Sequence, residues 1–259
     1  MDIFDSHTHL NDTPYRGKEA DYIEAARQLG VKKMAIVGSD TALNAGALTL
    51  AHEYPNLYAI VGWHPESSQD YDEAKEALLL KQLADPKVVA LGEIGLDYHW
   101  DTSPREIQRR VFRRQLELAR SLHMPVSIHS RDAFEDTYAI LKTAHVEQFG
   151  AIMHSFTGDA EWARRFLDLG LYISYSGIVS FKNAPEEHAS AKIIPSDRLL
   201  VETDAPYLTP TPYRGRQNQP GYTRYVVEAL AKLRDTTPDV IAQQTWDNAH
   251  RIFRLKEDA

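Results

Sequence analysis

The sequence predicts a (β/α)8 barrel formed by a single domain over residues 1–259. Eight short apolar runs alternate with longer segments of helical periodicity, and this pattern indicates βα units around a parallel sheet. A length of 259 residues is common for one such barrel. An open doubly wound sheet would more often carry a glycine-rich nucleotide turn, and neither G-x-G-x-x-G nor G-x-x-x-x-G-K-[ST] occurs in the chain.

The expected elements follow one another without a linker or an internal repeat. The strand runs are residues 3–9, 34–38, 58–63, 88–94, 126–129, 151–154, 172–175 and 199–204. The helical patterns lie near residues 18–29, 41–54, 71–84, 104–122, 132–147, 159–169, 185–193, 221–234 and 238–253. In the arginine-rich segment near 104–122, Ile107, Val111 and Leu118 form an apolar stripe. The interleaved Glu106 and Glu117 favour a solvated outer face there over a nucleic-acid surface.

The composition restricts the class of protein. A hydrophobic fraction of 43% is enough for a sizeable core. Because the chain has no cysteine, any metal must be held by histidine, carboxylate and water. The net charge of −8 argues against a protein that coats long nucleic acid, but it does not exclude an enzyme that hydrolyses a phosphodiester.

The chain shows no targeting or membrane signal. The N-terminus lacks a basic segment followed by an apolar run, and no apolar stretch approaches the length that spans a bilayer. We therefore expect a cytoplasmic protein that has no membrane partner, and nothing in the sequence implies an obligate protein partner.

The pair His7 and His9 is the strongest chemical signal. Side chains two residues apart in a strand point the same way, so two imidazoles at this spacing suit one divalent ion. Further candidates end later strand runs or follow them directly: His64, Glu93, His129, His154 and Asp204. Because the C-terminal strand ends of a (β/α)8 barrel surround one mouth, we expect these residues to converge there.

The set of imidazoles and carboxylates exceeds what one ion with open positions needs. It suits two divalent ions with Glu93 between them, one carboxylate oxygen facing each ion. Two neighbouring ions can activate water and polarise a substrate oxygen. Imidazole with carboxylate suits zinc, manganese, iron or nickel, and magnesium prefers more oxygen ligands, but the sequence does not distinguish Mg, Mn, Zn and Ni.

The ordered series of motifs resembles the TatD family of metal-dependent hydrolases, within the amidohydrolase-like metal barrels, over nearly the whole chain. The motifs are DSHTHL at 5–10, GWHP at 62–65, GEIGLDY at 92–98, IHSR at 128–131, HSFTG at 154–158 and ETDAPY at 202–207. The resemblance implies a TIM-like barrel, two divalent ions per chain and phosphoester hydrolysis by a metal-activated water. For some members the known activity is the trimming of DNA 3′ ends.

The resemblance also implies a role for each matching residue. One ion would be held by His7, His9, Glu93 and Asp204. The other ion would be held by Glu93, His129 and His154. Asp204 would also accept the proton of the attacking water, so Asp204 and Glu93 are the predicted catalytic residues. Two positions depart from the family pattern, because Asn11 and Gln219 stand where many relatives carry a carboxylate.

The candidates for contact with substrate are weaker signals. The candidate phosphate contacts are His64, Arg131 and Arg214. A structural role before Pro65 is the alternative for His64, and a surface salt bridge is the alternative for either arginine. The candidates for stacking on a base are Tyr98, Phe156 and Tyr207, with simple packing as the alternative. Glu202 is expected either to support the metal ligands or to belong to the barrel core.

Three classes of function are compatible with such a barrel. The first is a metal-dependent phosphodiesterase acting on nucleic acid or another phosphodiester, and the second is a binuclear amidohydrolase that cleaves a C–N bond in a small molecule. Many binuclear amidohydrolases bridge their metals with a modified lysine after the fourth strand, and Glu93 in that place favours the first class. The third class is a non-catalytic binding module, and the complete ligand set argues against it.

Overall fold

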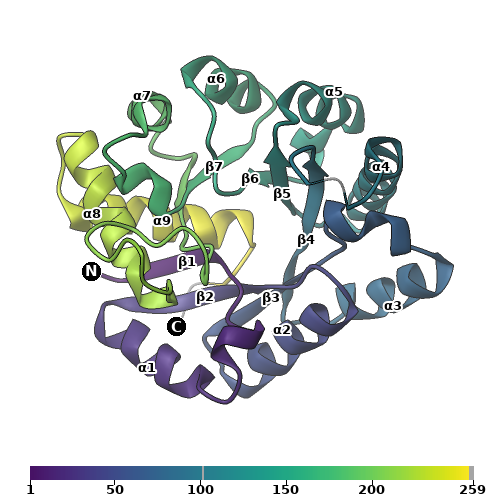
Figure 1. Cartoon of the computed structure of the whole chain (residues 1–259), viewed down its shortest axis with the longest axis horizontal. Helices are drawn as coiled ribbons and strands as arrows, with labels where there is room; N and C mark the ends of the chain where they lie inside the picture. Colours follow the sequence, from purple (N-terminus) through teal and green to yellow (C-terminus); the bar gives the residue numbers. More distant parts are fainter. Residues whose placement is uncertain (101, 257–259) are drawn as a thin grey trace.

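The computed structural model describes residues 1–100 and 102–256, and it shows eight parallel strands that alternate with helices (Figure 1). The strands are β1 (Ile3–Thr8), β2 (Val31–Val37), β3 (Leu57–Val61), β4 (Val88–Asp97), β5 (Val126–Arg131), β6 (Ala151–Met153), β7 (Tyr172–Tyr175) and β8 (Leu199–Val201). The α-helices are α1 (Glu19–Gln28), α2 (Thr41–Glu53), α3 (Glu73–Leu83), α4 (Arg105–Ser121), α5 (Phe134–Ala144), α6 (Ala160–Asp168), α7 (Pro185–Ile193), α8 (Thr223–Leu233) and α9 (Pro238–Ile252). Short 3-10 helices are η1 (Thr13–Tyr15), η2 (Pro65–Asp70), η3 (Val146–Gln148), η4 (Gly177–Ser180) and η5 (Pro220–Tyr222).

The strands form one sheet in sequence order, in which each strand from β1 to β8 pairs with the next. Backbone bonds just beyond the strand ends join β8 to β1. The Asp204 N–H donates to the His7 carbonyl at 3.0 Å, and the His9 N–H donates to the Ala205 carbonyl at 2.8 Å. The sheet is therefore a nearly closed barrel surrounded by helices, which confirms the predicted fold class (Figure 1).

Apolar packing closes the N-terminal end of the barrel. Phe4 near the start of β1 belongs to one buried cluster with Ala249 and Ile252 of α9 and with Phe253, which follows α9. The rings of Phe4 and Phe253 lie 5.6 Å apart. Helix α9 therefore covers this end, and in Figure 1 it crosses behind the strands.

Every expected strand and helix is present, and the differences lie at their ends. Strand β6 ends at Met153 and β8 ends at Val201, so His154 and Asp204 follow their strands instead of ending them. Strand β4 continues to Asp97, beyond the expected end at residue 94. The turns after the strands therefore position part of the site.

Candidate metal centre

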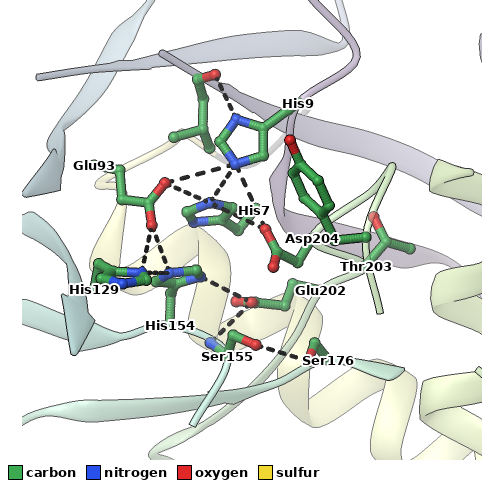
Figure 2. A network of polar contacts seen from close by, with 12 residues as sticks. His7, His9, Glu93, His129, His154, Ser155, Ser176, Glu202, Thr203 and Asp204 are labelled. Atoms are coloured by element: carbon green, nitrogen blue, oxygen red, sulfur yellow. Dashed lines mark hydrogen bonds and ion pairs between the residues drawn. The ribbon is translucent and has the colours of Figure 1, made fainter. Parts of the chain in front are cut away.

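The predicted metal ligands converge at the C-terminal end of the barrel, as expected from their places at strand ends. Figure 2 shows the carboxylate of Glu93 between His7 and His9 on one side and His129 and His154 on the other. Three of the six residues lie within strands: His7, Glu93 and His129. The other three lie beyond strand ends: His9, His154 and Asp204.

The two oxygens of Glu93 face different partners. Oε2 lies 3.5 Å from His7 Nε2 and 3.6 Å from His9 Nε2. Oε1 lies 3.0 Å from His129 Nδ1 and 2.8 Å from His154 Nε2. One carboxylate thus joins two groups of nitrogen donors, which is the geometry that a ligand shared by two ions requires.

Asp204 completes the first of these groups. Its Oδ1 lies 3.8 Å from His7 Nε2 and 3.5 Å from His9 Nε2. The backbone of Asp204 has a φ of 53°, in the left-handed region that aspartate tolerates better than most residues. Asp204 therefore reaches the cluster from a turn, a position that alternation along a strand does not describe.

Glycine at position 95 lets β4 and β5 approach closely beside the cluster. Gly95 has a φ of 143°, and a Cβ there would come within 1.9 Å of the His129 carbonyl oxygen. A larger residue would push β5 away from β4, and it would carry His129 away from Glu93.

Each of the four imidazoles is also fixed through its second ring nitrogen. The contacts are His7 Nδ1 with Ser127 Oγ at 3.3 Å, His9 Nδ1 with the Val37 carbonyl at 3.1 Å, His129 Nε2 with Asp97 Oδ2 at 2.8 Å and His154 Nδ1 with Glu202 Oε1 at 3.1 Å. Such contacts set the ring orientation and the tautomer of a metal-binding histidine. The support role considered for Glu202 is consistent with this geometry, and Glu202 is also fully buried.

Asp97 is the main site residue that sequence reasoning misses. Its Oδ2 contacts His129, and its Oδ1 accepts the N–H groups of His99 at 2.9 Å and Trp100 at 3.1 Å. Even spacing along β4 puts Glu93 and Asp97 on one face, so strand periodicity is a signal that could find it.

The electrostatics of the cluster favour positive charge on His129 and His154, whereas burial and the neighbouring His154 lower the pKa of His7. Burial opposes protonation of His129, but its bonds to Asp97 and Glu93 raise its pKa to about 9. Burial also opposes protonation of His154, but the charges of Glu93 and Glu202 raise its pKa well above the ordinary value. Burial alone would raise the pKa of Glu93, yet the His154 and His64 imidazoles hold it well below its usual range. A divalent cation would satisfy the same field more strongly than protons do.

The donor set fits divalent ions. Three groups of donor atoms lie within 4.8 Å of one another: His7 with His9 and Asp204, His64 with Glu93 and His129, and His7 with His154 and Glu202. Within the described residues, Glu202 Oε2 is buried and has no hydrogen-bond partner, so it adds negative potential beneath the cluster. Imidazole and carboxylate together are ligands of zinc, manganese and nickel.

His64 lies beside the cluster, and each of the two arginines lies over an aromatic ring. His64 Nε2 is 3.6 Å from Glu93 Oε1, and its Nδ1 accepts the Glu66 N–H at 3.3 Å. The exposed Arg131 guanidinium lies 5.6 Å from the centre of the Trp100 ring. The exposed Arg214 guanidinium lies 3.6 Å from the centre of the Phe181 ring. A phosphate contact by any of the three stays a prediction.

The three candidate stacking residues have different surroundings. Phe156 is buried and packs near Phe134 and Tyr175, so the packing alternative holds for it. Tyr98 is half-buried, and its hydroxyl donates to Asp136. Tyr207 is exposed, and its ring centre lies 6.4 Å from that of His9.

Asn11, one of the two departures from the family pattern, touches the site indirectly. Its side-chain N–H2 donates to the carbonyls of Val37 at 3.0 Å and Leu43 at 2.7 Å. The Val37 carbonyl is also the partner of His9 Nδ1. An aspartate at position 11 could not donate these bonds, so the amide suits the support of His9 in this chain.

A nearly closed eight-stranded barrel that holds imidazoles around a shared carboxylate at its C-terminal mouth defines a metal-dependent hydrolase class of protein. A sequence model of the family described as TatD related DNase matches residues 4–254. The chain belongs to this family.

Relatives of similar length support this assignment. The chain is 46% identical over 253 residues to the uncharacterized metal-dependent hydrolase YabD of Bacillus subtilis, covering 98% of this chain and 99% of that protein. It is 34% identical over 259 residues to a Salmonella typhimurium protein named 3′-5′ ssDNA/RNA exonuclease TatD, covering 98% of this chain and 99% of the relative.

Solved structures agree with the fold. The crystal structure of YJJV, a TatD homologue from Escherichia coli, superposes with a TM-score of 0.91 at 31% identity over 98% of each chain. A TatD family hydrolase from Entamoeba histolytica shares the fold, with a TM-score of 0.87 at 22% identity over 97% of this chain and 98% of that chain. Within residues 1–100 and 102–256, no helix is both long enough and apolar enough to cross a membrane.

Proposed function

We propose that the protein is a divalent-metal-dependent phosphodiesterase that removes nucleotides from the 3′ end of single-stranded nucleic acid, with DNA as the expected substrate. The observation that carries the proposal is the division of the two Glu93 oxygens between two groups of imidazoles. The family assignment and the exonuclease name of the Salmonella typhimurium relative support the substrate class.

Each group of side chains would hold one ion. The first ion would be bound by His7, His9, Asp204 and Glu93 Oε2. The second ion would be bound by His129, His154 and Glu93 Oε1. When bound, such ions lower the pKa of water and neutralise charge on a reacting phosphate. The contacts behind the rings, such as Asp97 with His129, would keep the imidazoles aimed at the ions.

Asp204 is the proposed acceptor of the water proton. Burial would raise its pKa, but the His9 hydrogen bond and the nearby imidazoles lower it below the ordinary value. The carboxylate is therefore ionised at neutral pH, as a base must be. Its side chain is 14% exposed against 5% for Glu93, so Asp204 is the carboxylate that water reaches more easily.

The test is a metal-supplemented assay of the purified protein with Mg, Mn, Zn and Ni in turn. The substrates are 5′-labelled single-stranded DNA, the same sequence as RNA, bis(p-nitrophenyl) phosphate and a panel of small amides, and the control is the Glu93→Gln variant. We expect stepwise shortening of the DNA from its 3′ end, with little activity in the control. Turnover of amides in the absence of any phosphodiester hydrolysis would contradict the proposal and would favour the amidohydrolase alternative.

A further inference from the structure

Two exposed aromatic rings stand at the mouth of the barrel. Among the phenylalanine, tyrosine and tryptophan side chains of the described residues, only Trp100 (51%) and Tyr207 (56%) are exposed. Trp100 follows β4, the strand that carries Glu93, and Tyr207 follows β8 and the nearby Asp204. Large exposed apolar groups that gather at one end of a protein indicate a binding surface.

The two residues follow strands that lie on opposite sides of the barrel. In a barrel ordered from β1 to β8, the fourth and eighth strands face each other across the axis. The Tyr207 ring lies 6.4 Å from the ring of His9, in the first group of imidazoles. The backbone of Trp100 is joined to the second group, because Asp97 accepts the backbone N–H of Trp100 and also contacts His129. Each group of imidazoles therefore has an exposed aromatic residue in the segment that follows a neighbouring strand.

The surroundings of Trp100 suit a nucleotide. The Arg131 guanidinium lies 5.6 Å from the centre of its ring, and both side chains are exposed. A flat ring offers a face to any nucleobase, and an adjacent guanidinium attracts the phosphate backbone. A small phosphodiester or an amide presents no base to such a ring, so this arrangement favours a polynucleotide end as the occupant.

We propose that Trp100 and Tyr207 each stack on one nucleobase of a bound single strand, with the scissile phosphodiester between them at the cluster. The inference rests on the proposed function and names the part of the substrate that the mouth recognises. Because stacking is tolerant of base identity, binding should show little sequence preference. In this arrangement the Arg131 guanidinium contacts the phosphate of the nucleotide whose base stacks on Trp100.

The first experiment separates base recognition from chemistry. Kinetics are measured for Trp100→Ala and Tyr207→Ala on a short thymidine oligonucleotide and on a base-free oligonucleotide, in which an abasic tetrahydrofuran residue replaces every nucleoside. We expect each variant to raise KM for the oligonucleotide by about 5- to 150-fold, with kcat near that of the parent protein. Turnover of the base-free oligonucleotide should stay at the parent level. Trp100→Phe and Tyr207→Phe should recover most of the affinity, because they keep a ring.

Leu122→Ala is the matched control. Leu122 is 45% exposed, and it follows α4 at the opposite end of the barrel, so its loss should change KM and kcat for neither substrate.

The second experiment places an abasic residue at the last or the next-to-last position of the thymidine oligonucleotide. In the parent protein each abasic site should raise KM. In the variant that lacks the matching ring, the same abasic site should cause no further rise.

Two results would overturn the proposal: a KM for the thymidine oligonucleotide at the parent level in both alanine variants, or equal damage to the turnover of the base-free oligonucleotide. Hydrolysis of neither substrate by the parent protein would contradict the proposed function instead. The stacking would then still be tested by fluorescence anisotropy, in which a labelled phosphorothioate oligonucleotide should bind the parent protein more tightly than it binds either alanine variant.

Discussion

The two ends of the barrel are built from opposite kinds of residue. At the N-terminal end, Phe4 and Ile60 pack against Ile252 and Phe253 in a buried apolar cluster. At the C-terminal end, carboxylates and imidazoles contact one another around Glu93 (Figure 2). The difference teaches that stability and chemistry are separated along the axis of this barrel. Substitutions at one end should therefore change one property and spare the other.

The largest effect is expected at the centre of the polar end. Glu93→Gln should nearly abolish hydrolysis and weaken metal binding, because a neutral amide cannot balance two cations as a carboxylate does. The far-UV circular dichroism spectrum should match that of the parent protein. Metal content and turnover close to the parent values would rule out a shared carboxylate.

The converse test lies at the apolar end. Phe4→Ala should lower the free energy of unfolding by about 3–5 kcal/mol, since it removes a buried ring that contacts Phe253. Phosphodiesterase turnover per folded molecule should not change. Denaturant unfolding checks the predicted loss of stability, and kcat measured on the same sample checks the unchanged turnover. A large loss of kcat in fully folded protein would show that the two ends are coupled.

Asp204 and His64 should differ in their effects on the chemical step. Asp204→Asn should slow the chemical step by roughly a hundred-fold or more, as loss of a general base does, and leave substrate binding largely intact. His64→Ala should slow it less, because His64 Nε2 lies 3.6 Å from Glu93 Oε1 and His64 is not among the proposed ion ligands. Single-turnover assays at saturating metal compare them. Greater damage in the His64 variant would reverse the assignment of the base.

A smaller effect is expected behind the rings. Asp97→Asn should weaken the binding of one ion by about 10- to 100-fold, because Asp97 orients His129. Ser127→Ala, behind His7, should instead weaken the binding of the other ion. Calorimetric titration of the chelator-treated proteins resolves the two binding steps. If both variants weakened the same step, the division of imidazoles into two sites would be wrong.

The smallest effect expected is a pH dependence. The pKa of His129 is raised from 6.5 to about 9 by Asp97 and Glu93 against the effect of burial. In chelator-treated protein, this shift stabilises the fold below pH 6.5, and the contribution is lost as the pH rises through 9. Metal binding depends on pH in the opposite direction, because the ion must displace the proton on His129. Deprotonation of His129 should therefore raise metal affinity by at most about ten-fold for each unit that the pH rises.

Titration calorimetry at pH 7 and pH 8 in buffers of different ionisation enthalpy counts the protons released. Asp97→Asn is the control, since it removes the first of the two bonds that raise the pKa of His129. Metal affinity that is the same at the two pH values would contradict this assignment.

The convergence of the site could be predicted from the sequence for a geometric reason. The C-terminal ends of parallel strands in a barrel share one mouth, so placing His7, Glu93 and His129 at strand ends was enough to bring them together. The contacts behind the rings could not be predicted in the same way. The contact between His7 and Ser127 depends on strand register and ring rotation, which residue spacing does not record.

Turn conformation explains the remaining differences. Ser155 has a φ of 42°, so its left-handed backbone interrupts the alternation after β6, and Phe156 enters the core instead of the mouth. Asp204 has the same kind of backbone, yet there the turn carries a functional side chain to the cluster. A single sequence pattern for strand ends cannot separate these two outcomes.

The seam of the barrel has a consequence for synthesis of the chain. The backbone bonds that join the first strand to the segment after the last one are made by His7, His9, Asp204 and Ala205. Three of these residues would hold the first ion, so that site needs both ends of the chain in place. A nascent polypeptide cannot assemble this site until residue 205 has left the ribosome. An ion bound there would link β1 to the segment after β8. The proposed site is therefore formed only when the barrel is complete.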